Sequence, residues 1–484
     1  MLNREEIYIG SRWRRPAGQD RLDVVSPMTE EVFATVPLAT PADVDVAVAA
    51  ARNAFDEGPW PHMTVKERGA YLTRVMELLA PRVDEIVHLQ IDEMGSPLSF
   101  MGPLTGGAVK SIAAEVAEME AFETAELRDG PAGKVLVERL PIGVVGAIIP
   151  WNGPVHSLLG RMVTPLLAGC TVIAKPAPET PLSAYLVAEA FHEAGIPEGV
   201  VSIIPGGVEV GERLVSHPGV NRISFTGSTA AGERVASLAA SSFKSVTLEL
   251  GGKSAAILLD DVDIDKRLSQ VIESSMPNNG ELCFATTRIL VPRSREQEMI
   301  DALVGAVSGL VVGDPHEKST AVGPLAARRQ RERVEKYLAI GREQGATVAC
   351  GGARPRNLDR GWFVEPTVFT GVTTDMTIAQ EEIFGPVISV MAYDDDADAV
   401  RIANDSDYGL GGAVFTEDLD RGVEVARRVT TGTCRINEAP PGGGGGPFGG
   451  VKRSGLGRER AREGRENCYQ IKSIALPSGY IPTL

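Results

Sequence analysis

The sequence contains 484 residues, of which 43% are hydrophobic and 23% are charged. This composition is typical of a globular protein, and the length exceeds what one hydrophobic core organises, so we expect two or three domains. The formal net charge of −16 argues against nucleic acid or an anionic membrane surface as the main partner. No apolar stretch approaches the roughly 20 residues that span a bilayer, and the first residues lack the apolar core of a signal peptide. We therefore expect a cytoplasmic protein with no membrane partner.

Three helix starts are marked by capping residues. Thr40 precedes Pro41 and an acidic first turn, and Thr64 begins the capping box Thr64-Val65-Lys66-Glu67. A third helix is predicted to open at Thr180-Pro181 and to stop at Gly195, because glycine tolerates the conformation that follows a helix end.

Short apolar runs rich in β-branched residues lie between these helical segments. They occupy residues 144–149, 171–174, 200–204 and 222–225. They are apolar throughout rather than alternating, which is typical of strands buried on both faces of a parallel sheet. Strands and helices that alternate in this way predict an α/β fold with right-handed crossovers.

The five cysteines, at positions 170, 283, 350, 434 and 468, are odd in number and widely spaced. A disulfide framework is therefore not expected, and no CxxC or HxxH pair indicates a metal site. Most of these cysteines should be inert buried thiols.

Three polar residues could carry chemistry, although each also has a structural explanation. Cys283 follows Gly280, which permits a close backbone approach, but a cysteine among apolar neighbours is most often structural. Glu249 lies between two leucines, where burial would raise its carboxyl pKa, or it could form an ion pair with Lys253. Asn152 follows a predicted strand, where α/β proteins place ligands, or it could belong to a simple turn.

Taken together, these residues resemble the aldehyde dehydrogenase superfamily. The resemblance extends from Tyr8 to about Lys472, with the family's markers in order. The markers are Pro150-Trp151-Asn152, Lys175-Pro176-Ala177, Phe225-Thr226-Gly227-Ser228-Thr229, Leu248 to Lys253, Gly280 with Cys283, Glu381 to Pro386, Asn437, and Pro447 to Gly450.

The resemblance implies an oxidation of an aldehyde to a carboxylic acid with NAD(P). Cys283 would attack the aldehyde carbon, because the thiolate is the reactive form of cysteine. Asn152 and the Cys283 backbone N–H would stabilise the oxyanion. After hydride transfer, Glu249 would activate water to hydrolyse the thioester.

The resemblance also assigns the cofactor site. Gly227 and Ser228 lead into a helix whose N-terminal N–H groups can meet a pyrophosphate. Lys175 would bind the adenosine ribose and Glu382 the nicotinamide ribose, and Trp151 and Phe384 belong to the same site. For Phe384, simple core packing is an equal alternative.

NAD is the expected cofactor, and NADP is left open. Many relatives carry a glutamate three residues after the ribose-binding lysine, where it disfavours a 2′-phosphate. Here that position is Pro178, and the acid stands at Glu179. No arginine or further lysine stands beside Lys175 in the sequence to pair with a phosphate.

The substrate prediction depends on three glycines. Several relatives line the aldehyde tunnel with aromatic residues at the positions of Gly153, Gly160 and Gly442. The loss of these rings predicts a wide entrance and a bulky or aromatic aldehyde. His156 either borders this tunnel or is an ordinary half-buried histidine.

By resemblance, the fold is α/β, with a doubly wound Rossmann-type cofactor domain, an α/β catalytic domain and a small β oligomerisation arm. The NAD(P)-binding domain would comprise residues 1–119 and 140–250, and the catalytic domain residues 251–451. Residues 120–139 and 452–484 would form the arm and the C-terminal segment. Exposed strand edges in the arm predict a homodimer or homotetramer.

Two other enzymatic functions compete with this interpretation. An acylating dehydrogenase would pass the acyl group to coenzyme A, but such relatives tend to lack a glutamate at the position of Glu249. A cofactor-independent thioesterase would use Cys283 and leave Lys175 and Glu382 unexplained. A non-catalytic binding protein is disfavoured because both the nucleophile and the base are present.

Overall fold

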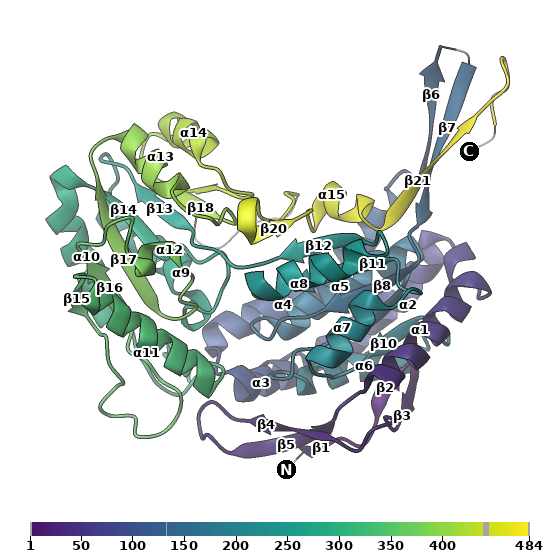
Figure 1. The fold of residues 1–484 in the computed structure, drawn as a ribbon, viewed down its shortest axis with the longest axis horizontal. Helices are drawn as coiled ribbons and strands as arrows, with labels where there is room; N and C mark the ends of the chain where they lie inside the picture. Colours follow the sequence, from purple (N-terminus) through teal and green to yellow (C-terminus); the bar gives the residue numbers. More distant parts are fainter. Residues whose placement is uncertain (1, 132, 439–444, 483–484) are drawn as a thin grey trace.

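Two twisted α/β layers form the body of the molecule, and a narrow antiparallel arm projects from one end (Figure 1). The computed structural model describes residues 2–131, 133–438 and 445–482. Gly442, which the substrate prediction uses, lies outside the described residues. The chain begins beside a small sheet of β1 (Leu2–Asn3), β5 (Val32–Pro37) and β4 (Arg21–Val25).

The larger sheet confirms the strands expected from sequence. Its order is β20 (Gly455–Leu456), β12 (Ser245–Glu249), β11 (Arg222–Thr226), β8 (Val144–Ile148), β9 (Thr171–Lys175), β10 (Val201–Ile203), β2 (Ile7–Ile9) and β3 (Arg12–Arg14). The five strands from β12 to β10 in this order pair in parallel. The strand order reverses at β8, because β9 and β10 follow on one side and β11 and β12 on the other. A reversal of this kind opens a crevice at the carboxyl ends of the strands.

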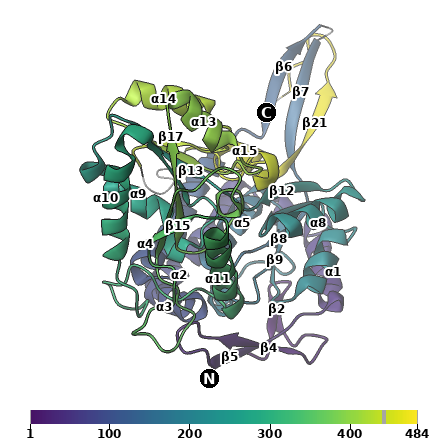
Figure 2. The same ribbon diagram turned by 60° about the vertical axis from the view of Figure 1, so that its left-hand side comes forward.

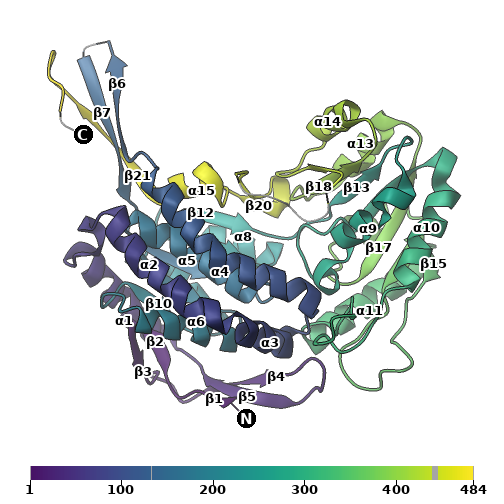
Figure 3. The same cartoon turned by 180° about the vertical axis from the view of Figure 1, so that it is seen from behind.

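Helices cover both faces of this sheet. Figure 3 shows one face, and the opposite face lies toward the viewer in Figure 1. The first face packs against α2 (Val65–Leu79), α4 (Leu98–Glu120), α5 (Pro154–Ala168) and α6 (Leu182–Glu193), with α3 (Val83–Met94) alongside. The second face packs against α1 (Pro41–Asp56), α7 (Val208–Ser216) and α8 (Thr229–Ala240).

Two of the three expected helix starts are confirmed, and the third differs. Thr40 and Thr64 form full capping boxes at the starts of α1 and α2. Helix α6 begins at Leu182, without a side-chain cap from its own segment. Its first N–H groups instead donate to the buried carboxylate of Glu93 from α3, at 2.5 and 3.2 Å. A tertiary contact thus replaces the local cap. The helix ends before Gly195 as expected, and Gly195 has a φ of +73°.

The second sheet is also mainly parallel and carries helices on both faces. Its order is β15 (Thr347–Cys350), β16 (Thr367–Thr370), β17 (Val387–Tyr393), β14 (Arg288–Pro292), β13 (Ala255–Leu258), β18 (Gly412–Phe415) and β19 (Arg435–Ile436). Helices α9 (Ile264–Ser275) and α10 (Glu296–Ser308) pack on one face. The other face carries α11 (Arg328–Glu343), α12 (Thr377–Gln380), α13 (Asp396–Asn404) and α14 (Leu419–Arg428).

The arm is an antiparallel sheet of β6 (Ala125–Gly130), β7 (Gly133–Pro141) and β21 (Tyr469–Ala475). It rises clear of the two layers in Figure 2. Short helix α15 (Ala461–Glu466) leads into β21. Ile471 on β21 is 70% exposed. Strand β21 is an edge strand of this sheet, and it pairs only with β7 among the described residues.

Candidate active site

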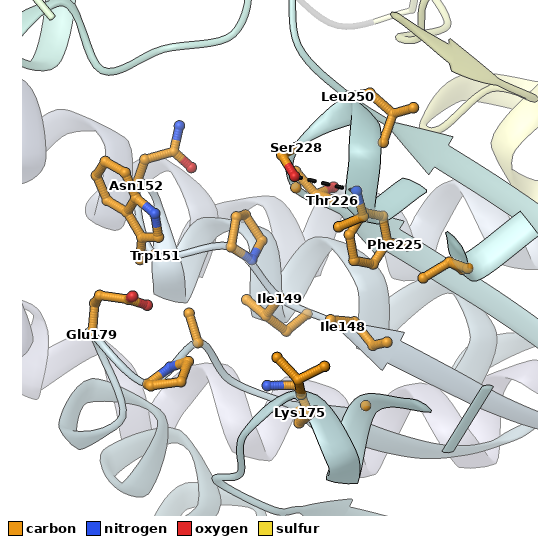
Figure 4. Close-up of a pocket in the computed structure, with 18 of the residues that line it drawn as sticks. Ile148, Ile149, Trp151, Asn152, Lys175, Glu179, Phe225, Thr226, Ser228 and Leu250 are labelled. Atoms are coloured by element: carbon orange, nitrogen blue, oxygen red, sulfur yellow. Dashed lines mark hydrogen bonds between the residues drawn. The ribbon is translucent and has the colours of Figure 1, made fainter. Parts of the chain in front are cut away.

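A pocket of about 600 Å³ lies at the carboxyl ends of the parallel strands of the larger sheet, where the strand order reverses. Its walls come from the ends of β8, β9, β11 and β12, from α8, and from the α11 side of the second layer. Figure 4 shows the strand-end residues around the cavity, with Trp151 and Asn152 facing Ser228 across it. The pocket unites the predicted cofactor residues Trp151, Lys175, Gly227, Ser228, Glu382 and Phe384 with Asn152 and Cys283.

The first turn of α8 faces this pocket. Ser228 is its N-cap and accepts a hydrogen bond from the Ala231 N–H at 3.3 Å. The Gly227 N–H donates to the Glu249 carbonyl oxygen at 3.1 Å, which fixes the turn to the neighbouring strand. A helix N-terminus directed at a cavity attracts negative charge, because its unpaired N–H groups and the helix dipole act together.

Lys175 is the last residue of β9, and its ammonium group is buried. It donates to the carbonyl oxygens of Gly206 at 2.8 Å and Pro176 at 3.1 Å. Burial lowers the pKa of Lys175 to about 8, while Glu179 and Glu209 oppose this shift. Because an ammonium group has three N–H bonds, one donor is left for a ligand.

Glu179, the acidic residue close to Lys175 in the sequence, has an ion-pair partner that the sequence did not indicate. Glu179 lines the pocket and forms an ion pair with Arg329 of α11. The two residues are 150 positions apart in the chain. Nothing beside Lys175 in the sequence indicates Arg329, because the approach of α11 to this strand end is a result of how the two layers pack.

Two aromatic residues form the opposite end of the pocket. The rings of Trp151 and Phe384 meet edge to face, with centroids 5.4 Å apart. Phe384 adopts a φ of +63°, which is unusual for a bulky residue. It is only half-buried and lines the pocket, so simple core packing does not account for its position.

Glu382 lies near Phe384 at the junction of the two layers. Its Oε1 accepts a hydrogen bond from the Gly252 N–H at 2.9 Å. Burial raises the pKa of Glu382 to about 7, and this hydrogen bond opposes the shift together with Arg333 and Lys253. Arg333 holds the same segment by donating to the carbonyl oxygens of Glu382 and, at 3.1 Å, Ile383.

The Cys283 loop is built from residues in left-handed backbone conformations. Asn278, Asn279 and Gly280 have φ values of +51°, +60° and +73°. A Cβ at position 280 would overlap the carbonyl oxygen of Gly385, so the close approach expected at this glycine is confirmed. Asn279 anchors the loop, because its amide donates to the carbonyl oxygens of Gly95 at 3.1 Å and Pro324 at 3.0 Å.

Asn152 and the Cys283 loop are directly connected. The Asn152 Nδ2 donates to the Glu281 carbonyl oxygen at 2.9 Å. In return, the Asn278 amide donates to the Asn152 carbonyl oxygen at 3.0 Å. Since a side-chain amide carries two hydrogens on nitrogen, Asn152 keeps one donor for a ligand. Burial raises the pKa of the Cys283 thiol to about 12, with Glu382 and Glu249 adding to the shift, so the resting thiol is protonated.

Glu249 ends β12 but does not line the pocket with Cys283. It is 1% exposed, and neither carboxylate oxygen has a hydrogen-bond partner within the described residues. One oxygen would lie 2.8 Å from a Cβ at Gly449, so only glycine leaves room there. Burial, followed by the charge of Glu459, raises the pKa of Glu249 to about 9. Lys253 forms no ion pair with it in the described structure; its Nζ is buried and also lacks a hydrogen-bond partner there.

Several charged residues around Glu249 were missed from sequence. Arg161 of α5 forms an ion pair with Glu459 at 2.9 Å, and the Ser224 hydroxyl donates to Glu459 at 2.9 Å. Arg460 donates to the His156 Nε2 at 2.7 Å. In the sequence, the only indication of a charged cluster near Glu249 was the run from Arg458 to Arg460, and such a run is equally typical of an exposed surface turn.

The sequence model of the aldehyde dehydrogenase family matches residues 13–474. The chain belongs to this family. It is 43% identical over 477 residues to a geranial dehydrogenase of Castellaniella defragrans, with 98% of this chain and 99% of the relative covered. It is 40% identical over 480 residues to a 3-succinoylsemialdehyde-pyridine dehydrogenase of a Pseudomonas species, with coverage of 98% and 99%.

Solved structures of the family share the whole fold. A Mycobacterium tuberculosis aldehyde dehydrogenase complexed with NAD+ has a TM-score of 0.97 and 45% identity, and the match covers 99% of this chain and 100% of that one. An NAD+ complex of a Bacillus cereus aldehyde dehydrogenase has a TM-score of 0.94 and 37% identity, with coverage of 97% and 96%. The α/β aldehyde dehydrogenase fold expected from sequence is therefore confirmed.

Three further observations concern metal binding, membrane helices and the cysteines. Within the described residues, no group of three or more histidine, cysteine or acidic side chains is placed to hold a metal ion. None of the helices in the described ranges is both long and apolar enough to cross a membrane. All five cysteines are free thiols.

Proposed function

We propose that this enzyme oxidises an aldehyde to a carboxylic acid with NAD+ in the pocket at the strand ends. The observation that carries the proposal is the presence of Cys283, Asn152 and Glu382 in the walls of one pocket, in a chain of the aldehyde dehydrogenase family. The NAD+ complexes of related structures support the choice of cofactor.

The residues that line the pocket fit NAD+. The cavity volume of about 600 Å³ is in the range of ligand pockets. The start of α8 at Gly227 and Ser228 is suited to a pyrophosphate, and the unused donor of Lys175 to ribose hydroxyls. Glu382 has one oxygen occupied by the Gly252 N–H, which leaves the other oxygen for the second ribose. Trp151 and Phe384 supply flat apolar surfaces beside it.

In the proposed mechanism, the Cys283 sulfur adds to the aldehyde carbon as its thiol proton passes to solvent, because the neutral thiol is a weak nucleophile. The remaining N–H of Asn152 and the backbone N–H of Cys283 donate to the oxygen that becomes negative. NAD+ supplies the hydride acceptor. The acyl group is then held as a thioester on the Cys283 sulfur.

Glu249 is the proposed base for thioester hydrolysis. Its carboxyl group lies next to Gly449, and it is close enough to Cys283 for its charge to affect the thiol pKa. A carboxyl group with a pKa near 9 is neutral while Cys283 reacts, so it does not repel the thiolate. Once ionised, the same group is a strong base for water. Transfer of the acyl group to coenzyme A would make this base unnecessary, so a coenzyme A product is disfavoured.

We propose NAD rather than NADP as the preferred cofactor. Glu179 lies in the pocket near Lys175, and its carboxylate pairs with Arg329, so this arginine is not free to bind a 2′-phosphate. The positive charge of Arg329 is compensated by the ion pair with Glu179. We expect kcat/KM to be higher with NAD than with NADP in steady-state assays; equal or reversed values would contradict this.

A bulky or aromatic aldehyde is the proposed substrate type. A Cβ added at Gly160 would meet nothing within 4 Å, and a Cβ at Gly153 would make only ordinary contacts at 3.7 and 3.9 Å. Both positions therefore have room that larger residues do not occupy here. The relatives named for geranial and for 3-succinoylsemialdehyde-pyridine agree with a substrate larger than a short aliphatic aldehyde.

The decisive experiment is a screen for NADH formation with aliphatic, aromatic and terpenoid aldehydes and both cofactors, with and without coenzyme A. We expect NADH and free acid, with bulky aldehydes giving the highest kcat/KM. An acyl-coenzyme A product would replace the proposal with the acylating function. Ester turnover without NADH from any aldehyde would replace it with a thioesterase.

We also propose that the arm joins subunits into a homodimer or homotetramer. Strand β21 pairs with β7 on one side only, and Ile471 is exposed. Size-exclusion chromatography with light scattering should give an assembled species, and a stable monomer would contradict this. The domain boundaries and the cytoplasmic location stay predictions; five free thiols agree with a reducing compartment.

A further inference from the structure

Arg460 lies close enough to Cys283 and Glu249 to interact with both electrostatically. Residues Phe448 and Glu459 form an antiparallel bridge, with backbone hydrogen bonds of 2.8 and 2.7 Å. Arg460 follows this bridge directly and adopts a φ of +62°, and Ala461 adopts +50°. Two consecutive non-glycine residues in the left-handed region store strain, which structures retain mainly at functional sites. The bridge places the Arg460 guanidinium over the Phe448 ring, 5.3 Å from its centroid.

The hydrogen-bond partner of Arg460 is a neutral side chain. The Arg460 Nη2 donates to the Nε2 of His156 at 2.7 Å. Burial, together with the charges of Arg460 and Arg161, lowers the pKa of His156 to about 3, so the ring accepts this bond without becoming charged. Within the described residues, no carboxylate lies at ion-pair distance from the Arg460 guanidinium. The cation is held in position without an ion pair.

The position of His156 links Arg460 to the reacting groups. His156 lies in the first turn of α5, four residues after Asn152. Gly153 and Gly160 lie three residues before it and four after it, so they share its helix face. Arg460 contacts His156 and therefore lies beside this helix face, on which the two glycines carry no side chain. Cys283 and Glu249 both lie within electrostatic range of Arg460.

The local charge at this end of the site is positive. Arg161, Arg458 and Arg460 all act on Glu249, together with one glutamate, Glu459. Arg161 is paired with Glu459, whereas Arg458 donates to the carbonyl oxygens of Gly450 and Gly457. Besides Glu249, three arginines and one glutamate thus meet at this end of the site, in a chain whose net charge is −16. A local field of this sign attracts an anion and repels a cationic substrate.

We propose that the Arg460 guanidinium binds a carboxylate that the aldehyde carries at the end remote from its carbonyl group. A planar guanidinium matches a carboxylate with two parallel hydrogen bonds, which gives orientation as well as affinity. Phe448 and Phe284 meet edge to face at 6.1 Å beside it, so the spacer between the two groups packs against aromatic surface. The substrate class is therefore a bulky aldehyde that is also an acid. This inference rests on the proposed function, and makes Arg460 a specificity-determining residue for it.

The test uses two matched substrate pairs: 4-formylbenzoate with its methyl ester, and a longer aliphatic ω-oxo acid with its methyl ester. For the wild-type enzyme we expect a higher kcat/KM for the acid than for the ester in at least one pair, by about tenfold or more, mainly through KM. Added salt should lower kcat/KM for the acid but not for the ester, since ionic attraction is screened.

Arg460→Gln should lower the ratio of acid to ester kcat/KM by at least about tenfold. Arg460→Lys should retain part of it, because it keeps the charge and loses the planar fork. Arg462→Gln is the matched control: this arginine lies on α15 and pairs with Glu466 on the surface, so the ratio should stay within about twofold. The ratio separates recognition from general damage, since a misfolded variant loses activity toward both substrates together.

Equal kcat/KM values for acid and ester in both pairs would overturn the inference while leaving the proposed function intact. A ratio unchanged by Arg460→Gln would overturn it as well. Absence of NADH with every aldehyde would instead refute the proposed function on which the inference rests.

Discussion

On the cofactor side of the pocket, the polar side chains are held by hydrogen bonds to the protein backbone: Lys175 donates to two carbonyl oxygens, Ser228 caps α8, and Glu382 accepts from Gly252. On the reacting side, Glu249 is buried without such a partner among the described residues. Both carboxylate oxygens of Glu249 lack a hydrogen-bond partner in the described structure, and burial keeps the Cys283 thiol protonated.

The difference reflects what each side must do. Recognition groups gain from being fixed, because ordering them in advance removes an entropic cost of binding. Glu249 must change its charge during the cycle, and burial without an ion-pair partner raises its pKa to about 9, closer to neutral pH than an ion pair would leave it. Changes on the reacting side should therefore act on kcat, and changes on the cofactor side on KM for NAD.

The largest expected effect is that of Cys283→Ser. A serine hydroxyl in the same buried site is a much weaker nucleophile, so NADH formation should fall by at least about 10⁴-fold while NAD binding is retained. Binding is measured by quenching of tryptophan fluorescence. Cys350→Ser, on the edge strand β15, is the control and should keep full activity. Substantial activity in Cys283→Ser would refute the assigned nucleophile.

Glu249→Gln should block turnover after the first hydride transfer. We expect a burst of about one NADH per active site followed by a slow phase, reduced about 10³-fold, because thioester hydrolysis loses its base. In the wild-type enzyme the ionised base becomes more abundant as the pH rises toward the pKa of about 9. If hydrolysis limits turnover, kcat should increase from pH 7, reach half of its maximum near pH 9 and level off above it.

The neighbouring Glu459 provides a second test of this pKa. Its negative charge raises the pKa of Glu249, so Glu459→Gln should lower that pKa and move the plateau of kcat to a lower pH. A pH profile that is flat in the wild-type enzyme, or that does not move in this variant, would show that Glu249 is not the base that limits turnover.

Asn152→Ala should lower kcat by about 10²- to 10³-fold, the usual effect of losing one oxyanion donor. The KM for NAD should change little, because Asn152 acts on the aldehyde oxygen in the proposed mechanism. Asn404→Ala is the control, since this side chain also bonds backbone groups but lies at the end of α13, away from the pocket. A loss of less than about tenfold would remove Asn152 from the oxyanion site.

The smallest effect is expected on the cofactor side. Lys175→Ala should raise the KM for NAD by about tenfold and change kcat by less than about threefold, because it removes one charged hydrogen bond to a ribose. Lys244→Ala is a matched control, since this lysine also donates to two carbonyl oxygens, at 2.8 and 2.9 Å, but does not line the pocket. An effect on kcat alone would contradict the division between the two sides.

The sequence by itself determined the local elements and the residues that could react. Capping boxes at Thr40 and Thr64 and apolar runs at the buried strands depend on neighbouring residues, so they can be read along the chain. The order of motifs indicated the family, and Gly280 marked the tight approach of the Cys283 loop. The start of α6 could not be read in the same way, because its cap is Glu93 from another helix.

Only the tertiary structure decided how these residues are charged and which partners they meet. The ion pair of Glu179 with Arg329 and the contact of Arg460 with His156 join segments that are far apart in the sequence. The shifts in the pKa values of Cys283 and Glu249 arise from desolvation, which depends on how completely several elements exclude water. Burial and long-range charge are sums over the packed molecule, and no local pattern of residues contains them.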